Sequence, residues 1–322
     1  MTAVRRLGAA VALAALSCAS PPDPSPSVPE ARAVRYLARE VPQWPVKNKC
    51  FSCHNNGDAA RALMAASATD PAAVGAALAD TFTWLADPPA WNRAVVNRGV
   101  DNKILARIQF AAALTDAVAR GDAPAAALAA AADMVAADQE ADGFWRVDTG
   151  DNVGSPVTYG AALATAMALK TLVASERAAV APAIARARAW LIRAPLRAVP
   201  DAAGMLLGLP RTTADDATVG ARRRAADKLF AEQDARGGWG PFATVTAEPF
   251  DTALAILALQ TLAAGPARDR AIASGRAWLR TAQYADGSWP ETTRPAGQVS
   301  YAQSISTTGW CLLALTESGP GR

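Results

Sequence analysis

The residues best suited to chemistry in this chain are Cys50, Cys53 and His54, which lie in the run CFSCH over positions 50–54. At the C-x-x-C-H spacing, two thioethers can hold the two vinyl-derived carbons of one porphyrin. The adjacent imidazole can then ligate the iron, so we expect one covalent haem c with His54 as its proximal ligand. His54 is the only histidine of the chain, so no other imidazole competes for this role. The sequence leaves the distal ligand open.

Two other arrangements of the same side chains also remain open. Cys50, Cys53 and His54 could supply three zinc ligands with Cys311 as the fourth, although adjacent residues rarely share one tetrahedral ion comfortably. Cys50 and Cys53 could instead form a disulfide or a redox pair, but the thioredoxin-like strand–helix–strand context is missing. Cys311 by itself has the character of a small buried hydrophobe. The stretch 44–57 resembles the haem-attachment segment of single-haem cytochromes c, which favours the haem.

The N-terminus has the pattern of an export signal. Arg5 and Arg6 precede an apolar run from Leu7 to Leu16, which is too short to span a bilayer but suits a signal peptide over residues 1–18. The run ends in ALSC, which resembles a bacterial lipobox and predicts lipidation of Cys18. A signal peptide without lipidation is the alternative. We therefore expect an exported protein, periplasmic or held at the outer membrane by a lipid anchor.

The rest of the chain is expected to be a tether and one domain. Residues 19–30 are rich in Pro and Ser and predict an extended tether, and residues 31–322 have ample length for one large core. Hydrophobic residues make up 51% of the chain and aromatic residues only 6%, with alanine favouring closely packed helices. Without Arg5 and Arg6, 30 basic side chains face 29 acidic ones. This balance gives no reason to expect a nucleic acid partner.

A repeat of about 50 residues organises this domain. The pattern Q-x-x-x-G-x-W occurs at 139–145, 233–239 and 283–289. Equivalent positions of a helical stretch recur at about the same spacing through the rest of the chain. Each of six units is expected to contain two helices that bury an apolar face against their neighbours. The expected pairs are 30–40 with 53–67, 70–86 with 101–120, 124–139 with 156–174, 182–193 with 201–209, 221–234 with 250–264, and 267–283 with 300–317.

The stretch from Gly275 to Trp289 resembles the QW repeat of squalene-hopene cyclases and other α/α-toroid proteins, including prenyltransferases. The resemblance covers about residues 30–320. It implies an all-α ring of about six helical hairpins around a central cavity, although the short fourth unit leaves closure of the ring open. It also implies structural roles for the repeat residues, with Gln capping a helix end and Trp packing on the next hairpin. These residues are Gln139, Trp145, Gln233, Trp239, Gln283 and Trp289.

The motifs that serve the known enzymes of this fold are missing. Terpene cyclisation depends on a D-x-D-D acid motif, and the nearest match, Asp215 and Asp216, is expected only to begin an outer helix. With one histidine, the chain does not reproduce the Asp/Cys/His zinc site of prenyltransferases or lanthionine cyclases. Five acids near the starts of inner helices could line the mouth of the cavity, but they are expected instead to cap helices and face solvent. These are Asp148, Asp151, Glu248, Asp251 and Glu291.

These patterns predict an exported α/α toroid that carries one c-type haem and serves redox chemistry or electron transfer with a partner protein. The alternative is a cyclase-like or isoprenoid-binding toroid for an apolar small molecule, in which Cys50, Cys53 and His54 are structural, as a zinc site or a disulfide. A third possibility is a lipoprotein scaffold without chemistry. The sequence identifies no catalytic residue.

Overall fold

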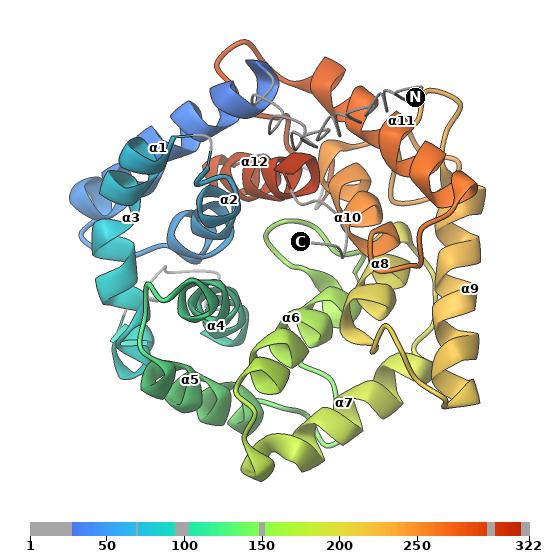
Figure 1. Ribbon diagram of the computed structural model, residues 1–322, viewed down its shortest axis with the longest axis horizontal. Helices are drawn as coiled ribbons and strands as arrows, with labels where there is room; N and C mark the ends of the chain where they lie inside the picture. Colours follow the sequence, from blue (N-terminus) through green and yellow to red (C-terminus); the bar gives the residue numbers. More distant parts are fainter. Residues whose placement is uncertain (1–27, 69, 94–102, 148–151, 295–299, 317–322) are drawn as a thin grey trace, which may run out of the picture.

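The computed structural model describes residues 28–68, 70–93, 103–147, 152–294 and 300–316. These segments are all-α and form an α/α toroid, as the repeats predicted (Figure 1). The outer helices are α1 (Val28–Asn48), α3 (Pro71–Leu85), α5 (Ala125–Ala137), α7 (Ala181–Arg193), α9 (Asp216–Glu232) and α11 (Pro266–Ala282). The inner helices are α2 (Ala60–Ala65), which continues the π-helix η1 (Cys53–Ala59), then α4 (Lys103–Arg120), α6 (Gly160–Ala174), α8 (Val199–Gly208), α10 (Pro249–Leu259) and α12 (Tyr301–Thr316).

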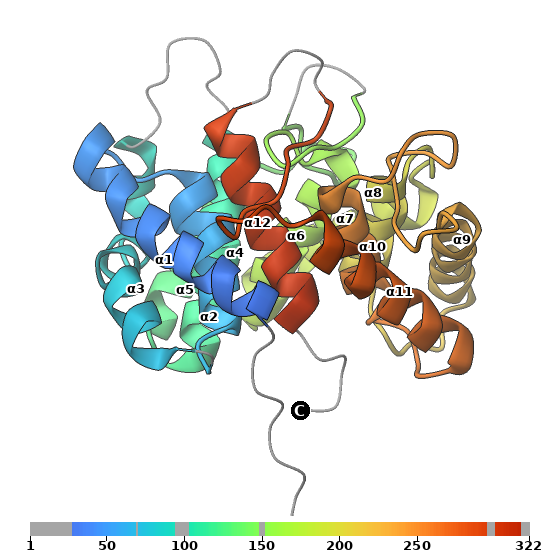
Figure 2. The ribbon, with the colours of Figure 1, turned by 90° about the horizontal axis from the view of Figure 1, so that it is seen from above.

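The inner helices form the core of the ring, and they run from one face of the ring to the other (Figure 2). Every residue of α10 is buried. Small residues let the inner backbones approach closely: a Cβ on Gly204 of α8 would lie 2.6 Å from the backbone of Ala162 in α6. Because the short α8 packs against both α6 and α10, the inner ring is continuous at the fourth unit.

Each repeat turn needs its glycine. Gly143, Gly237 and Gly287 have φ angles of +102°, +95° and +99°, a region that other residues rarely adopt. A Cβ on Gly143 would also lie 2.5 Å from the carbonyl oxygen of Arg186 in α7, and one on Gly287 would lie 2.4 Å from that of Arg32 in α1. The turn of one hairpin therefore rests directly on the backbone of the next outer helix.

The repeat glutamines join successive outer helices. The Gln139 amide donates to Gly143 O and to Ala183 O of α7, each at 2.9 Å. Gln233 makes the same pair of bonds with Gly237 and Ala271 of α11. Gln283 donates to Gly287 O and to Pro29 O of α1, which closes the ring between its last and first hairpins.

The repeat tryptophans are fully buried and bond to the outer helix of their own hairpin. The indole nitrogens of Trp145, Trp239 and Trp289 donate to carbonyl oxygens in the outer helices before them, at 2.8, 2.7 and 2.8 Å. Trp239 also packs against the next hairpin, since a Cβ on Gly275 of α11 would lie 2.8 Å from its ring. The indole therefore contacts two successive outer helices.

The first outer helix is longer than the sequence predicted. Helix α1 begins at Val28, inside the expected tether, and continues to Asn48 through Pro42 and Pro45. Its start is stabilised by Glu30 in the first turn, whose buried carboxylate pairs with Arg280 of α11 at 2.8 Å. The expected tether is therefore wrong over residues 28–30, which closure of the ring holds in a helix, while residues 19–27 lie outside the described residues.

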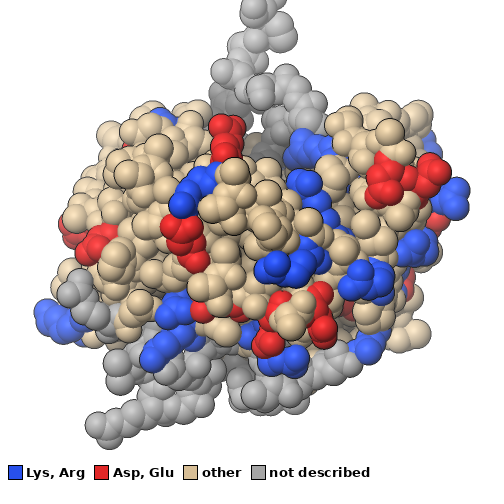
Figure 3. Space-filling view, turned by 90° about the horizontal axis from the view of Figure 1, so that it is seen from below, with Lys and Arg blue, Asp and Glu red and all other residues tan. Residues whose placement is uncertain are grey.

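The outer wall of the ring carries both signs of charge, and Lys and Arg side chains alternate with Asp and Glu on the side seen in Figure 3. Among the described residues, no helix is both long and apolar enough to cross a bilayer. The predicted signal peptide and Cys18 lie outside the described residues.

Candidate functional site

The C-x-x-C-H segment lies at the entrance to the first inner helix, as expected. Cys50 follows α1, and η1 begins at Cys53. Ser52 caps η1, because its hydroxyl accepts a hydrogen bond from the backbone N–H of His54 at 3.2 Å. The side chains of Cys50, Cys53 and His54 are half-buried and lie just before or at the start of the first inner helix.

The His54 ring is oriented by α12. Its Nδ1 lies 2.9 Å from Ser306 Oγ, and Ser306 in turn donates to the Asp58 carboxylate at 2.9 Å. Because the Ser306 hydroxyl donates its proton to Asp58, its oxygen must accept a hydrogen bond from His54 Nδ1–H. The proton of the neutral imidazole is therefore on Nδ1, and Nε2 is unprotonated. Burial lowers the pKa of His54 to about 4, so the imidazole is neutral near pH 7.

The three described cysteines, Cys50, Cys53 and Cys311, are free thiols. Burial, with the nearby charge of Asp58, raises the pKa of Cys53 to about 12, which is opposite to the depressed pKa of a redox-active C-x-x-C thiol. Cys311 is buried in α12 with its Sγ 3.5 Å from Pro249 O. Among the described residues, no three His, Cys, Asp or Glu side chains are placed to hold a metal ion together. The zinc alternative therefore has no preformed ligand set in this part of the chain.

Asp58 lies at the centre of a polar network between inner helices, a position that was not expected from the sequence. Its side chain is 1% exposed and accepts hydrogen bonds from Tyr159 Oη, from Gln109 Nε2 at 2.8 Å and from Ser306 Oγ at 2.9 Å. Burial raises the pKa of Asp58, although these bonds and the charge of Arg61 oppose the change. Tyr159 holds its position with a φ of +56°, which is rare for a bulky residue.

A second charged group follows on the other side of Arg61. The Arg61 guanidinium lies 5.2 Å from the centroid of the Trp310 ring, and its Nε donates to Asp116 at 3.0 Å. Lys170 also pairs with Asp116, at 2.5 Å. Burial by itself would raise the pKa of Asp116, but Lys170 and Arg61 outweigh it and lower the pKa. Arg61 therefore stands between the buried carboxyl group of Asp58 and the half-buried one of Asp116.

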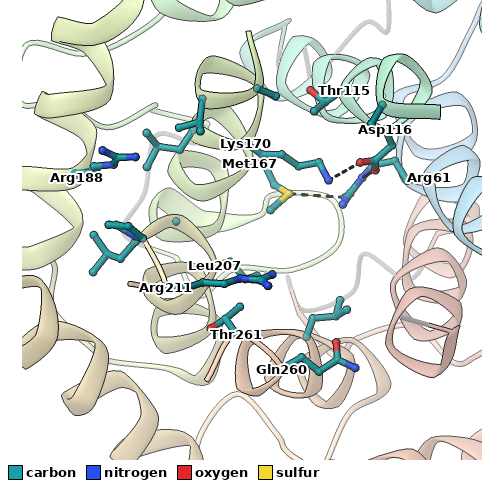
Figure 4. A pocket seen from close by; sticks show the side chains of 18 of the residues that line it. Arg61, Thr115, Asp116, Met167, Lys170, Arg188, Leu207, Arg211, Gln260 and Thr261 are labelled. Atoms are coloured by element: carbon teal, nitrogen blue, oxygen red, sulfur yellow. Dashed lines mark hydrogen bonds and ion pairs between the residues drawn. The ribbon is translucent and has the colours of Figure 1, made fainter. Parts of the chain in front are cut away.

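A cavity of about 630 Å³ lies beside this group, lined largely by the last turns of the inner helices (Figure 4). It is therefore near the opposite end of these helices from Cys53. Apolar side chains form much of the wall, including Met167, Val173, Leu207, Leu257 and Trp310. The charged side chains in the wall are Arg61, Asp116, Lys170, Arg188 and Arg211. Asp58 does not line the cavity.

Two acids that were expected to face solvent are buried. Glu248 and Asp251, at the start of α10, are 6% and 0% exposed and pair with Arg294, each at 2.5 Å. Burial raises the pKa of Asp251 to about 7, against the influence of Arg294. The expectation of solvated caps is wrong because the segment after α11 returns over the ring and delivers this arginine. Asp148 and Asp151 lie outside the described residues.

Asp215 has the structural role that the sequence predicted. It caps α9 and accepts from the backbone N–H of Thr218 at 3.0 Å and from its hydroxyl at 2.5 Å. The charged residues at the centre of the ring, in contrast, could have been noticed in the sequence only by their position. Asp58, Arg61 and Lys170 are charged residues inside inner helices, where alanine and leucine dominate.

The fold is similar to solved structures at low sequence identity. A variant of the type II terpene cyclase MstE from Scytonema, in complex with geranylgeranyl dihydroxybenzoate as substrate, has a TM-score of 0.57 at 12% identity, covering 89% of this chain and 97% of that chain. A protein from Actinoplanes has a TM-score of 0.52 at 17% identity, with 89% and 98% covered. A glycosidase has a TM-score of 0.52 at 15% identity, with 90% and 98% covered. No protein-family model and no curated protein sequence matches the chain.

Proposed function

We propose that this protein binds a small, partly apolar organic molecule of the isoprenoid type in the cavity of its toroid. The observation that carries the proposal is the cavity of about 630 Å³, which is within the range of small-molecule sites and has a partly apolar wall. The terpene cyclase of similar fold binds geranylgeranyl dihydroxybenzoate, which has an isoprenoid chain. The shared fold makes a ligand of this kind a reasonable first probe.

The lining favours binding over carbocation cyclisation. Arg61, Lys170, Arg188 and Arg211 all face the cavity, and cationic side chains would destabilise a carbocation in a site of low dielectric constant. Trp310 is the one aromatic ring among the described residues of the wall, and Arg61 already covers it. The buried acid Asp58 does not line the cavity, and Lys170 and Arg61 lower the pKa of Asp116, which does, so the described wall offers no carboxylic acid to protonate an isoprenoid.

The test is binding of farnesol, an isoprenoid alcohol, by isothermal titration calorimetry. We expect one molecule per chain, and we expect Leu207→Trp, which fills part of the cavity, to weaken binding at least about tenfold. Val219→Trp is the matched control, because Val219 is exposed on α9. If Leu207→Trp binds farnesol as well as Val219→Trp does, the ligand site is elsewhere or absent.

A covalent haem at Cys50 and Cys53 is the second candidate, and the orientation of His54 favours it. Both cysteines are free thiols, and His54 is neutral with Nδ1 engaged by Ser306. Histidine ligands of metals usually donate their other ring N–H in this way. The donor set therefore suits a haem, which Cys50 and Cys53 would hold through thioethers and whose iron His54 Nε2 would ligate. When bound, such a group would supply one-electron redox chemistry. With this function we also propose a redox partner protein and a lipid anchor at Cys18.

The haem is tested by exporting the full chain in cells with and without the cytochrome c maturation machinery. A pyridine haemochrome spectrum of the purified protein should show one covalent haem only when the machinery is present. The double variant Cys50→Ser/Cys53→Ser should lose it, while Cys311→Ala should keep it. A mature wild-type protein without covalent haem would exclude this second function and leave the cavity proposal unaffected.

A further inference from the structure

The positive charge of the cavity is only partly compensated. Its lining contains the cations Arg61, Lys170, Arg188 and Arg211 but one carboxylate, Asp116. Arg61 and Lys170 both pair with Asp116, so that carboxylate is fully used. Within the described residues, neither Arg188 nor Arg211 has a carboxylate within ion-pair distance. The wall therefore has a net positive charge.

Arg188 is the more informative of the two free arginines. It belongs to the outer helix α7 and is half-buried, and its side chain lines the cavity (Figure 4). Its Nε is inaccessible to solvent and has no hydrogen-bond acceptor. A buried, charged donor without a partner is costly, since it has lost its hydration without a replacement. An oxyanion entering the cavity would supply that partner.

Arg211 contributes positive charge from the adjacent element. It follows α8 closely, and α8 packs against α7. Figure 4 shows its side chain extending into the cavity. The field that it creates reaches Arg222, whose pKa is lowered by burial and by the charge of Arg211. Arg211 is exposed, so its long side chain is free to turn toward a ligand.

We propose that the cavity recognises an anionic amphiphile, whose phosphate or carboxylate head group is bound by Arg188 and Arg211 while its apolar chain lies along Leu207 and Leu257. Guanidinium groups match both oxyanions well, because they offer paired N–H donors in one plane. The proposal deepens the proposed function and rests on it, because it assigns the head group of a ligand that the cavity must first bind.

The test compares three ligands with the same chain: farnesol, farnesoic acid and farnesyl monophosphate. Calorimetry should show at least about tenfold tighter binding of one or both anions than of the alcohol, with an advantage that shrinks as salt is raised. The tighter of the two anions identifies the head group. If farnesol binds as tightly as both anions, the head-group assignment is overturned and the cavity proposal stands. If none of the three binds, both proposals fall.

Variants then assign the residues. Arg188→Gln should reduce the anion's affinity about tenfold, and Arg211→Gln about threefold because its charge is more exposed to solvent, with farnesol binding unchanged in both. Arg193→Gln, an exposed arginine on the same helix as Arg188, is the matched control and should bind like wild type. Circular dichroism establishes that each variant is folded. Equal losses for farnesol and for the anions would contradict recognition of the head group.

Discussion

Replacement of Asp58 tests whether the polar network at the centre of the ring stabilises the fold. Asp58→Ala leaves three buried donors without an acceptor: Tyr159 Oη, Gln109 Nε2 and Ser306 Oγ. An unsatisfied buried donor costs about 1–3 kcal/mol. Part of this loss is offset because the variant no longer buries a carboxyl group, whose desolvation is unfavourable and raises its pKa. We expect a net loss of about 4 kcal/mol, a large share of the 5–15 kcal/mol that is typical for a domain.

Asp58→Asn should be much milder, for a reason specific to this site. The Oε1 atom of Gln109 is buried and has no hydrogen-bond partner. If the Gln109 amide turns over, Oε1 can accept from the new asparagine N–H₂, and the asparagine oxygen still accepts from Tyr159. We expect a loss of about 1–2 kcal/mol for Asp58→Asn.

The assay is urea denaturation followed by circular dichroism at 222 nm, with the free energy of unfolding extrapolated to water. Asp80→Ala is the control, because Asp80 is exposed on α3 and should change stability by less than about 0.5 kcal/mol. The reasoning is refuted if Asp58→Ala is as stable as Asp80→Ala, or if Asp58→Asn is destabilised as much as Asp58→Ala.

Four further outcomes are expected. Burial raises the pKa of Asp251 from 3.8 to about 7, so the protonated carboxyl group favours the folded state. The free energy of unfolding of wild type, relative to that of Asp251→Asn, should therefore fall as pH rises between these values. Denaturation curves should show a slope of at most ~1.4 kcal/mol per pH unit. The pKa of His54 is lowered from 6.5 to about 4, so in protein produced without haem its contribution should be present above pH 6.5 and decrease toward pH 4, and His54→Gln should abolish that slope. Gln283→Ala removes the bonds to Pro29 and Gly287 that close the ring and should cost about 2–3 kcal/mol, and an unchanged urea midpoint would contradict this role. Since the pKa of Cys53 is about 12, iodoacetamide at pH 8 should alkylate it at least about tenfold more slowly than free cysteine, as followed by mass spectrometry.

The two candidate sites are near opposite ends of the inner helices, and this separates their tests. Cys53 and His54 are at the start of η1, whereas the cavity is lined mainly by the last turns of α4, α6, α8 and α10. Asp58 lies between them, and Arg61 on the next turn reaches the wall of the cavity. A haem on one face and a small molecule on the other are therefore compatible, and failure of one proposal carries no information about the other.

The sequence by itself determined the helical hairpins, their order and the position of the C-x-x-C-H segment. These features are local: alanine and leucine patterns specify helices, and each repeat turn needs a glycine with positive φ, such as Gly143 or Gly287. The expected bounds were correct to within four residues except at the end of α1, the start of α9 and the end of α10, and the early start of α1 is stabilised by Arg280 from the far end of the chain.

Only the tertiary structure decided which charged residues meet. Asp58 is joined to Ser306 across 248 positions of the chain, and Arg294 bonds Glu248 and Asp251 through a segment that the sequence offered no reason to fold inward. Acids near helix starts usually cap and face solvent, and that preference was overridden because closing the ring buried them beside an arginine. The partners of a buried charge depend on how the ring closes, and the local pattern of one helix carries no information about that.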